Sequence, residues 1–280
     1  MSVKKVISKF YGSCTTLVEV LNSEYENGMA KLNSHDESFR AIEFTCTSSY
    51  EEADSLLLAG YIEGAKKIQS ECVRISQKPE VRALRFTRAV AGGLPIVPAY
   101  LSNNPRCMFS PTRVLTQSSV VKVNINCIFG SKTSARQVSE AGAKIITAVR
   151  EIEKRGIRVE LNTGCIGAVY RHIKSGVPYG DKNIYSMFIC VKKASSPLNV
   201  LRIAYPIMHT SFLRRHYFRF LESLPSSMLD PKYMNDLLCV CSVDDLPTQY
   251  KMDGVYINLR SVIDSAFSVQ DIIDIILKQK

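Results

Sequence analysis

The most regular pattern of apolar and polar positions lies in residues 120–161. Residues 120–129 form a β-branched, apolar run with few polar interruptions, which is typical of a strand covered on both faces. Ser134 and Gln137 then have the spacing of a capping box, and apolar residues recur at steps of three and four along the helix that follows. Gly156 is placed to end this helix.

A second strand is predicted directly after that glycine, because Ile157, Val159 and Leu161 alternate with polar or charged residues. A strand, a long helix and a second strand predict a right-handed crossover in a parallel sheet. Ligands of such sheets bind outside the carboxyl ends of the strands. The turn at residues 130–134 is therefore the first place where a binding site is expected.

The rest of the second half also alternates between strand and helix patterns. Strands are predicted at residues 184–191, 237–242 and 254–259, helices at 198–224 with a break at Pro206 and after Ser268, and a connection at 163–181. This order predicts an α/β protein, a three-layer sandwich with a mostly parallel central sheet of Rossmann-like type.

The first third is predicted to be a helical extension of that sandwich. Helix patterns cover residues 6–22, 49–60 and 62–75, and a short strand is a candidate at residues 42–47.

Pro and Gly interrupt the next segment so often that no regular element is predicted there. Its apolar run at residues 91–101 is expected to pack as an irregular segment against the sheet. Three regions follow: a helical N-terminal region at 1–76, an irregular basic connection at 77–119 and the α/β sandwich at 120–280.

The net charge of +10 is unevenly distributed. Residues 1–60 hold five Lys or Arg against nine Asp or Glu, whereas residues 74–122 hold eight against one. Clustered arginines with little local acid are what a phosphate-binding surface needs. The candidate nucleic-acid-binding residues are Arg82, Arg85, Arg88, Arg106 and Arg113. The first three share one face if that segment is helical. The alternative is that the acidic N-terminal third docks on this basic segment.

A second basic cluster lies in residues 214–220, where Arg215, Arg219 and Glu222 fall on one side of the predicted helix. A solvated charged face is the favoured interpretation of this pattern.

Motifs for catalysis are incomplete. The turn at residues 130–134 contains a lysine and hydroxyls but not the phosphate-loop spacing, so an ordinary capped turn is favoured over an anion site. The four histidines lack metal-ligand spacing, no GxSxG elbow is present, and Cys239 and Cys241 have no second pair. We therefore expect no enzyme, no cofactor and no metal. The nine cysteines are expected to be reduced core residues in a cytosolic protein without a signal peptide or membrane span.

Several segments resemble a family of uncharacterised proteins encoded by tailed bacteriophages and prophages. They are Glu43-Phe-Thr-Cys-Thr-Ser-Ser-Tyr-Glu-Glu-Ala53, Gly60-Tyr-Ile-Glu-Gly-Ala65, Val90-Ala-Gly-Gly93, Tyr100-Leu-Ser-Asn-Asn-Pro-Arg-Cys-Met108 and Ile203-Ala-Tyr-Pro-Ile-Met-His-Thr-Ser-Phe-Leu-Arg-Arg215. The strand, turn and helix of residues 120–161 also resemble the von Willebrand factor A fold. That family often binds a divalent cation through an Asp-x-Ser-x-Ser turn. Here Phe129 stands where the aspartate is expected, and only Ser131 and Thr133 match, so the resemblance implies an A-domain without a complete metal site.

The resemblance implies a non-enzymatic, phage-encoded protein that works through protein–protein contacts in an assembly. Its partners are expected to be other phage or host proteins, in the cytoplasm of the bacterial host or in the virion. The strand-end loops are predicted to form one partner-binding surface that contains Ser131, Lys132, Thr133, Arg171, Lys174 and Asp244. The alternative is an accessory protein of phage replication or packaging that binds DNA or RNA through the arginines named above. The oligomeric state is left open.

Overall fold

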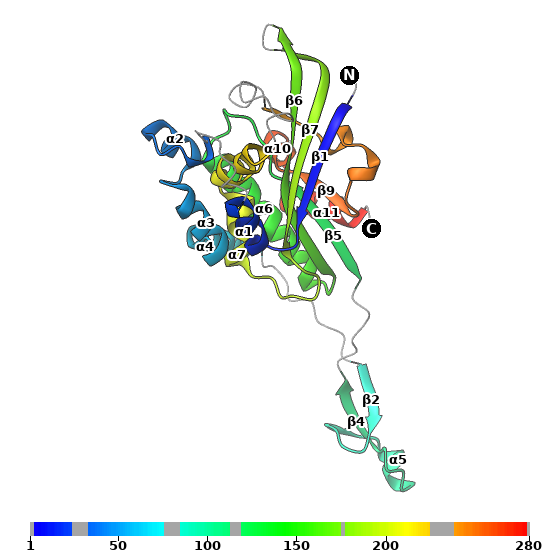
Figure 1. Cartoon of the computed structure of the whole chain (residues 1–280). Helices are drawn as coiled ribbons and strands as arrows, with labels where there is room; N and C mark the ends of the chain where they lie inside the picture. Colours follow the sequence, from blue (N-terminus) through cyan, green and yellow to red (C-terminus); the bar gives the residue numbers. More distant parts are fainter. Residues whose placement is uncertain are drawn as a thin grey trace.

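The computed structural model describes residues 3–23, 33–75, 85–112, 119–174, 177–224 and 238–278. A central sheet has the strand order β1-β7-β6-β5-β9, and β8 pairs with β6 beside this path (Figure 1). The strands are β1 (Val3–Tyr11), β5 (Val120–Asn126), β6 (Arg158–Lys174), β7 (Val177–Lys192), β8 (Leu238–Val240) and β9 (Val255–Asn258). The pairs β1·β7, β5·β6 and β5·β9 are parallel, so the sheet is mostly parallel as predicted.

The predicted crossover is confirmed. β5 and β6 pair in parallel, and helix α6 (Ala135–Lys154) connects them. The Ser134 side chain accepts a hydrogen bond from the backbone N–H of Gln137, whose side chain accepts one from the backbone N–H of Ser134. Gly156 follows the helix at φ +83°, a left-handed conformation that glycine adopts without steric cost.

The predicted connection at residues 163–181 is wrong. β6 and β7 form one long antiparallel hairpin, whose pairing runs from Leu161 with Lys192 to Lys174 with Val177. β8 also pairs with β6 in antiparallel orientation. Gly164 lies within this hairpin, where a Cβ would come 2.0 Å from the carbonyl oxygen of Met187. Close approach of two backbones, and not a turn, explains this glycine.

The predicted helix at residues 6–22 is wrong in its first half. Residues 3–11 are β1, an edge strand that pairs in parallel with β7. Only the second half is helical, as α1 (Cys14–Ser23). The strand candidate at residues 42–47 is also wrong, because Ser38 caps a helix there, α2 (Phe39–Thr45).

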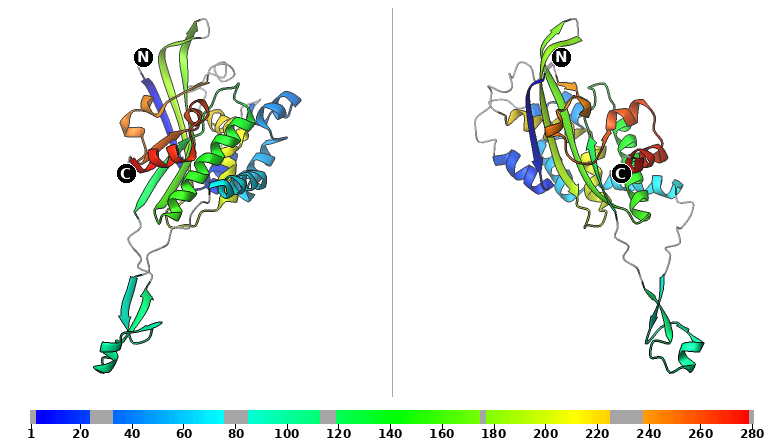
Figure 2. Two further views of the ribbon diagram at one scale, coloured as in Figure 1. Left: turned by 180° about the vertical axis from the view of Figure 1, so that it is seen from behind. Right: turned by 90° about the vertical axis from the view of Figure 1, so that its right-hand side faces the viewer.

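The helices gather on one face of the sheet (Figure 2). Cys165 and Met187 point into the large core on this face, whereas their strand neighbours Ile166 and Phe188 belong to a smaller core on the other face. The other helices of the sandwich are α3 (Tyr50–Ala59), α4 (Ile62–Ile75), α7 (Val200–Met208), the π-helix η3 (Phe212–Tyr217), α8 (Phe218–Glu222), α10 (Leu259–Asp264) and α11 (Val269–Lys278).

The second face is covered by the segment that contains two short 3-10 helices, η4 (Val243–Asp245) and η5 (Thr248–Tyr250). Cys241 and Leu246 of this segment pack on the sheet beside Phe188. Sheet, helices and this segment together form the layers of an α/β sandwich, and the predicted fold class is confirmed.

Residues 85–112 form a separate small unit, which we call the distal module. It projects from the sandwich at the end opposite the tip of the β6–β7 hairpin (Figure 1). It contains strands β2 (Arg85–Ala89), β3 (Leu94–Pro95) and β4 (Met108–Thr112), in the order β2-β4-β3, and the short helix α5 (Val97–Leu101). The expectation that residues 91–101 pack against the central sheet is therefore wrong.

Candidate functional site

The turn at residues 130–134 lies where the crossover predicted it, between β5 and α6. Ser131 and Lys132 are exposed. The side chain of Arg214 reaches the turn from η3 and donates hydrogen bonds to the carbonyl oxygens of Ser131, at 3.5 Å, and Thr133, at 3.3 Å. The buried guanidinium group of Arg214 thus stabilises the turn through its backbone carbonyl groups.

A pocket of about 400 Å³ opens between this turn and α2. Arg214 forms part of its wall, with its guanidinium carbon 3.9 Å from the ring centroid of Phe44, a cation–π contact. Burial lowers the pKa of Arg214 to about 10, so the group remains a cation at neutral pH. The remaining lining residues are Arg40, Glu43, Cys46, Ser131, Lys132, Thr133, Ser134 and Ala135. Charges of both signs line the pocket, which suits polar contact with a partner better than tight binding of one anion.

The six predicted partner-binding residues do not form one surface. Ser131, Lys132 and Thr133 line the pocket on the helical face, whereas Asp244 lies in η4, in the segment that covers the other face. Arg171 and Lys174 lie on β6 near the hairpin tip, and their side chains fall outside the described residues. The strand-end loops are therefore separated by the sheet itself.

The predicted nucleic-acid-binding residues belong to the distal module where they can be placed. Arg85 and Arg88 lie on β2, and Arg106 lies just before β4. Arg82 and Arg113 lie outside the described residues. The arginines were expected to share one face if this segment is helical, but residues 85–89 form a strand, so that condition is not met.

The part of the distal module whose side chains are described has almost no core. Between residues 88 and 110, Ala99 is the sole buried residue. A short three-stranded ribbon with so little buried apolar surface is marginally stable in isolation. Five of its large apolar side chains are instead exposed, with Leu101 at 77%: Val90, Leu94, Val97, Tyr100 and Leu101.

These exposed residues were missed by the sequence analysis, which assigned the run at 91–101 to packing on the sheet. A signal was present in the sequence. Two glycines and two prolines interrupt the run, and such breakers exclude a regular buried element. A run interrupted in this way is a poor candidate for a strand or helix in the interior of the sandwich.

The predicted solvated face of residues 215–222 is also wrong. Arg215 is fully buried, and Arg219 and Glu222 are almost so. The Arg215 guanidinium donates hydrogen bonds to the carbonyl oxygens of Ser34, at 2.7 Å, Asp36, at 2.9 Å, and Thr47, at 3.0 Å, and to the Thr47 hydroxyl. Arg215 therefore anchors residues 33–47 to η3.

A chain of polar side chains crosses the same region. His216 Nε2 lies 2.9 Å from Asp54 Oδ1, and its Nδ1 lies 3.3 Å from the Tyr205 hydroxyl. That hydroxyl lies 2.7 Å from the Ser211 hydroxyl, which lies 2.7 Å from His209 Nδ1. An Asp–His pair beside a serine has the composition of a hydrolase site. However, Tyr205, Ser211 and His216 are all fully buried, so the chain fastens the π-helix and has no open face for a substrate.

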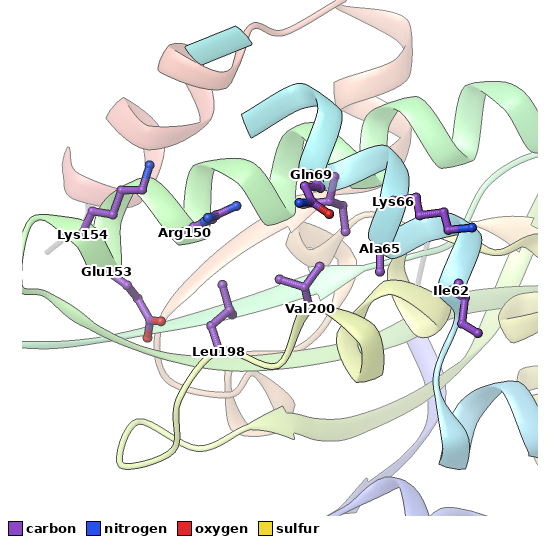
Figure 3. Close-up of a pocket in the computed structure, with 10 residues that line it drawn as sticks. Ile62, Ala65, Lys66, Gln69, Arg150, Glu153, Lys154, Leu198 and Val200 are labelled. Carbon is purple, nitrogen blue, oxygen red and sulfur yellow. The ribbon is translucent and has the colours of Figure 1, made fainter. Parts of the chain in front are cut away.

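A larger groove of about 570 Å³ lies between α4 and α6 (Figure 3). Ala65, Leu198 and Val200 provide apolar surface, and the side chains of Lys66 and Arg150 extend beside them. Glu153, which also lines the groove, is engaged by the buried Lys192 at 2.6 Å. The groove is open, and its ionisable lining residues are Lys66, Arg150, Glu153 and Lys154.

Within the described ranges, no group of three or more His, Cys, Asp or Glu residues is arranged to hold a metal ion. In the same part of the chain, no helix is both long and apolar enough to cross a membrane.

Comparisons with known proteins place the chain in a family without a described activity. No curated protein matches it, and no solved structure does. A family model described as "Domain of unknown function (DUF7192)" matches residues 2–262, which include the distal module and the sandwich as far as the first residues of α10, but not α11. The chain belongs to this DUF7192 family.

Proposed function

We propose that this chain is a non-enzymatic assembly protein that binds another protein through its distal module. The observation that carries the proposal is the absence of a core in the described residues 88–110, together with five exposed large apolar side chains. Exposed apolar groups clustered on a projecting unit mark a protein-interaction surface, because contact with a partner removes them from water. The module gains in the complex the burial that it lacks alone.

The composition of the module also describes the partner. Residues 85–112 contain three arginines and no aspartate or glutamate. Arg88 and Arg106 are exposed in the same small module as these apolar side chains. A complementary partner surface presents apolar residues with a rim of carboxylates, since opposite charges direct encounter and orientation.

The proposal that the protein is not an enzyme is supported by the burial of its most catalytic-like side chains. The polar chain from Asp54 to His209 is the arrangement in the described residues that most resembles catalytic machinery, and its Ser211 and His216 are fully buried. A role in a tailed-phage assembly remains the prediction of the sequence resemblance, as does the relation to A-domains.

A capture experiment compares this surface with the strand-end loops. The protein is used as bait in extracts of the cells that naturally contain it, with Tyr100→Ser plus Leu101→Ser as the module variant. We expect the amount of specifically captured protein to fall at least tenfold, because two exposed apolar side chains are removed from the interface. Thermal unfolding of the sandwich is expected to be unchanged, because both residues lie outside its cores.

The matched control is Lys132→Glu plus Asp244→Lys, which alters the strand-end loops and leaves the module intact. Capture that survives in the module variant and disappears in this control would move the binding surface back to the loops. Capture that is unchanged in both variants would contradict the proposed function.

Nucleic-acid binding is the second candidate, favoured by the arginines of an acid-free β-ribbon. It is weakened because residues 85–89 form a strand, and not the helix on which the three-residue spacing of the arginines would give one basic face. Fluorescence anisotropy with single- and double-stranded oligonucleotides tests it. If this candidate holds, affinity falls steeply with salt, and Arg88→Glu plus Arg106→Glu lowers the log–log salt slope by about 2. Binding confined to low salt, with no effect of these substitutions, rejects it.

A further inference from the structure

The helices α2, α3 and α4 present an acidic surface with exposed apolar residues. Between residues 33 and 63, six carboxylate side chains are exposed, and Arg40 is the only lysine or arginine: the acids are Asp36, Glu37, Glu43, Glu51, Glu52 and Glu63. Four large apolar side chains are exposed among them, with Phe39 at 81%: Phe39, Phe44, Leu58 and Ile62. We call residues 33–63 the acidic surface.

Some positive charge lies near this surface. Lys132 lines the pocket beside Glu43, and the buried guanidinium groups of Arg214 and Arg215 lie behind it. The exposed groups remain predominantly acidic, because those two guanidinium groups are directed at backbone carbonyls.

The acidic surface and the distal module are complementary. One carries exposed carboxylates together with exposed Phe39 and Ile62, and the other carries exposed arginines together with exposed Tyr100 and Leu101. The acidic surface has the two features that were derived above for the partner of the module, exposed apolar residues and exposed carboxylates. The chain therefore contains both halves of the interface that its module requires.

The two surfaces do not meet within one chain. α2, α3 and α4 lie on the helical side of the sandwich, and the distal module projects away from its lower end in the views of Figures 1 and 2. Both sets of apolar side chains stay exposed to solvent in the single chain.

We infer that the distal module of one copy docks on the acidic surface of a second copy of this chain. The inference rests on the proposed function and names its partner. Because the two contacting patches are different, the contact is head-to-tail and not two-fold symmetric. Each added copy leaves one free module and one free acidic surface, so the chains associate into a ring or an open filament.

The test is sedimentation velocity of the whole chain over a range of concentrations, with charge reversal of each surface. The module variant is Arg88→Glu plus Arg106→Glu, and the acidic-surface variant is Glu37→Lys plus Glu43→Lys. We expect the wild-type mass to rise with concentration, and each variant alone to stay monomeric at concentrations at least tenfold higher. The variant with all four substitutions is expected to associate again, because the substituted positions of the module and those of the acidic surface again carry charges of opposite sign.

Recovery in the fourfold variant separates a lost contact from a damaged fold, since it contains every substitution of the other two. Arg155→Glu plus Lys193→Glu, at exposed positions away from both surfaces, is the control and should associate like wild type. A wild-type protein that is monomeric at every concentration overturns the inference. The proposed function then still stands if the Tyr100 and Leu101 variant loses its captured proteins, and both fail if it does not.

Discussion

Replacement of Arg215 by alanine is expected to lower the free energy of unfolding by about 3–5 kcal/mol, the range for removal of one member of a buried charged network. The side chain has no exposed surface. Its loss removes a donor from the carbonyl oxygens of Ser34, Asp36 and Thr47, at about 1–3 kcal/mol for each buried group that finds no other partner. The Thr47 carbonyl keeps the Thr45 hydroxyl as a donor, so the buried Ser34 carbonyl is the group most affected. A cavity of arginine size adds to this loss.

Urea unfolding checks this expectation, with Arg202→Ala as the control. Arg202 lies on α7 and is exposed, so its replacement should change stability by no more than about 0.5 kcal/mol. Hydrogen exchange provides a second measurement, because residues 33–47 should lose protection first when their anchor is removed. Equal, small losses in both variants would show that residues 33–47 do not depend on Arg215.

Acidification from pH 6.5 to pH 4 is expected to destabilise the protein through His209. Burial lowers the pKa of His209 from 6.5 to about 4. Its Nδ1 accepts a hydrogen bond from the backbone N–H of Ser211 at 3.2 Å, which requires this nitrogen to be unprotonated. In this pH window the unfolded chain binds the proton and the folded chain does not, so stability falls as pH falls. The full effect is at most about 3 kcal/mol, reached near pH 4.

The control is His209→Asn, which retains an acceptor and cannot take up the proton. If His209→Asn lowers stability at pH 7, the unfolding midpoints of the wild type and of this variant should converge as the pH falls from 7 to 4. Thermal unfolding measures these midpoints. Other buried groups contribute equally to both proteins. Burial lowers the pKa of His35, with the same sign as His209, and raises that of Glu222, whose contribution weakens as pH rises. Parallel midpoint curves would contradict the assignment to His209.

The sequence predicted best where an element is specified by its own residues. The capping box at Ser134, the apolar stripe of α6 and the glycine after it are all local, and the structure contains all three. The same holds for α11, where the Ser268 side chain accepts a hydrogen bond from the backbone N–H of Asp271.

Prediction failed where distant residues decide the structure. β1 is a strand because β7 offers it a free edge, and no pattern within residues 3–11 records that edge. Arg215 and Arg219 were assigned to solvent because arginines are rarely buried without a partner. Their partners are largely backbone carbonyls of residues far away in the chain, such as Leu21 and Ser34, and a sequence does not show which carbonyls lack a donor.

The distal module also shows which properties can be predicted from local sequence and which cannot. The basic character of the distal module was evident from composition alone, and it drew attention to the segment that the proposed function now uses. Its assignment to packing on the sheet followed from the usual rule that apolar runs are buried. The structure places Tyr100 and Leu101 in solvent, which turns an expected core segment into the proposed docking surface.

The pairing of β1 with β7 has a consequence for synthesis on the ribosome. Val6 pairs with Ile184, so the first strand to be made must wait until about 180 further residues have been added. At a translation rate of about 5–20 residues per second, this interval lasts roughly 10–35 s. Lys4 and Lys5 are exposed in β1 and give the waiting segment a charge that opposes pairing with a neighbouring nascent chain. β7 therefore receives its parallel partner from a strand that was made long before it.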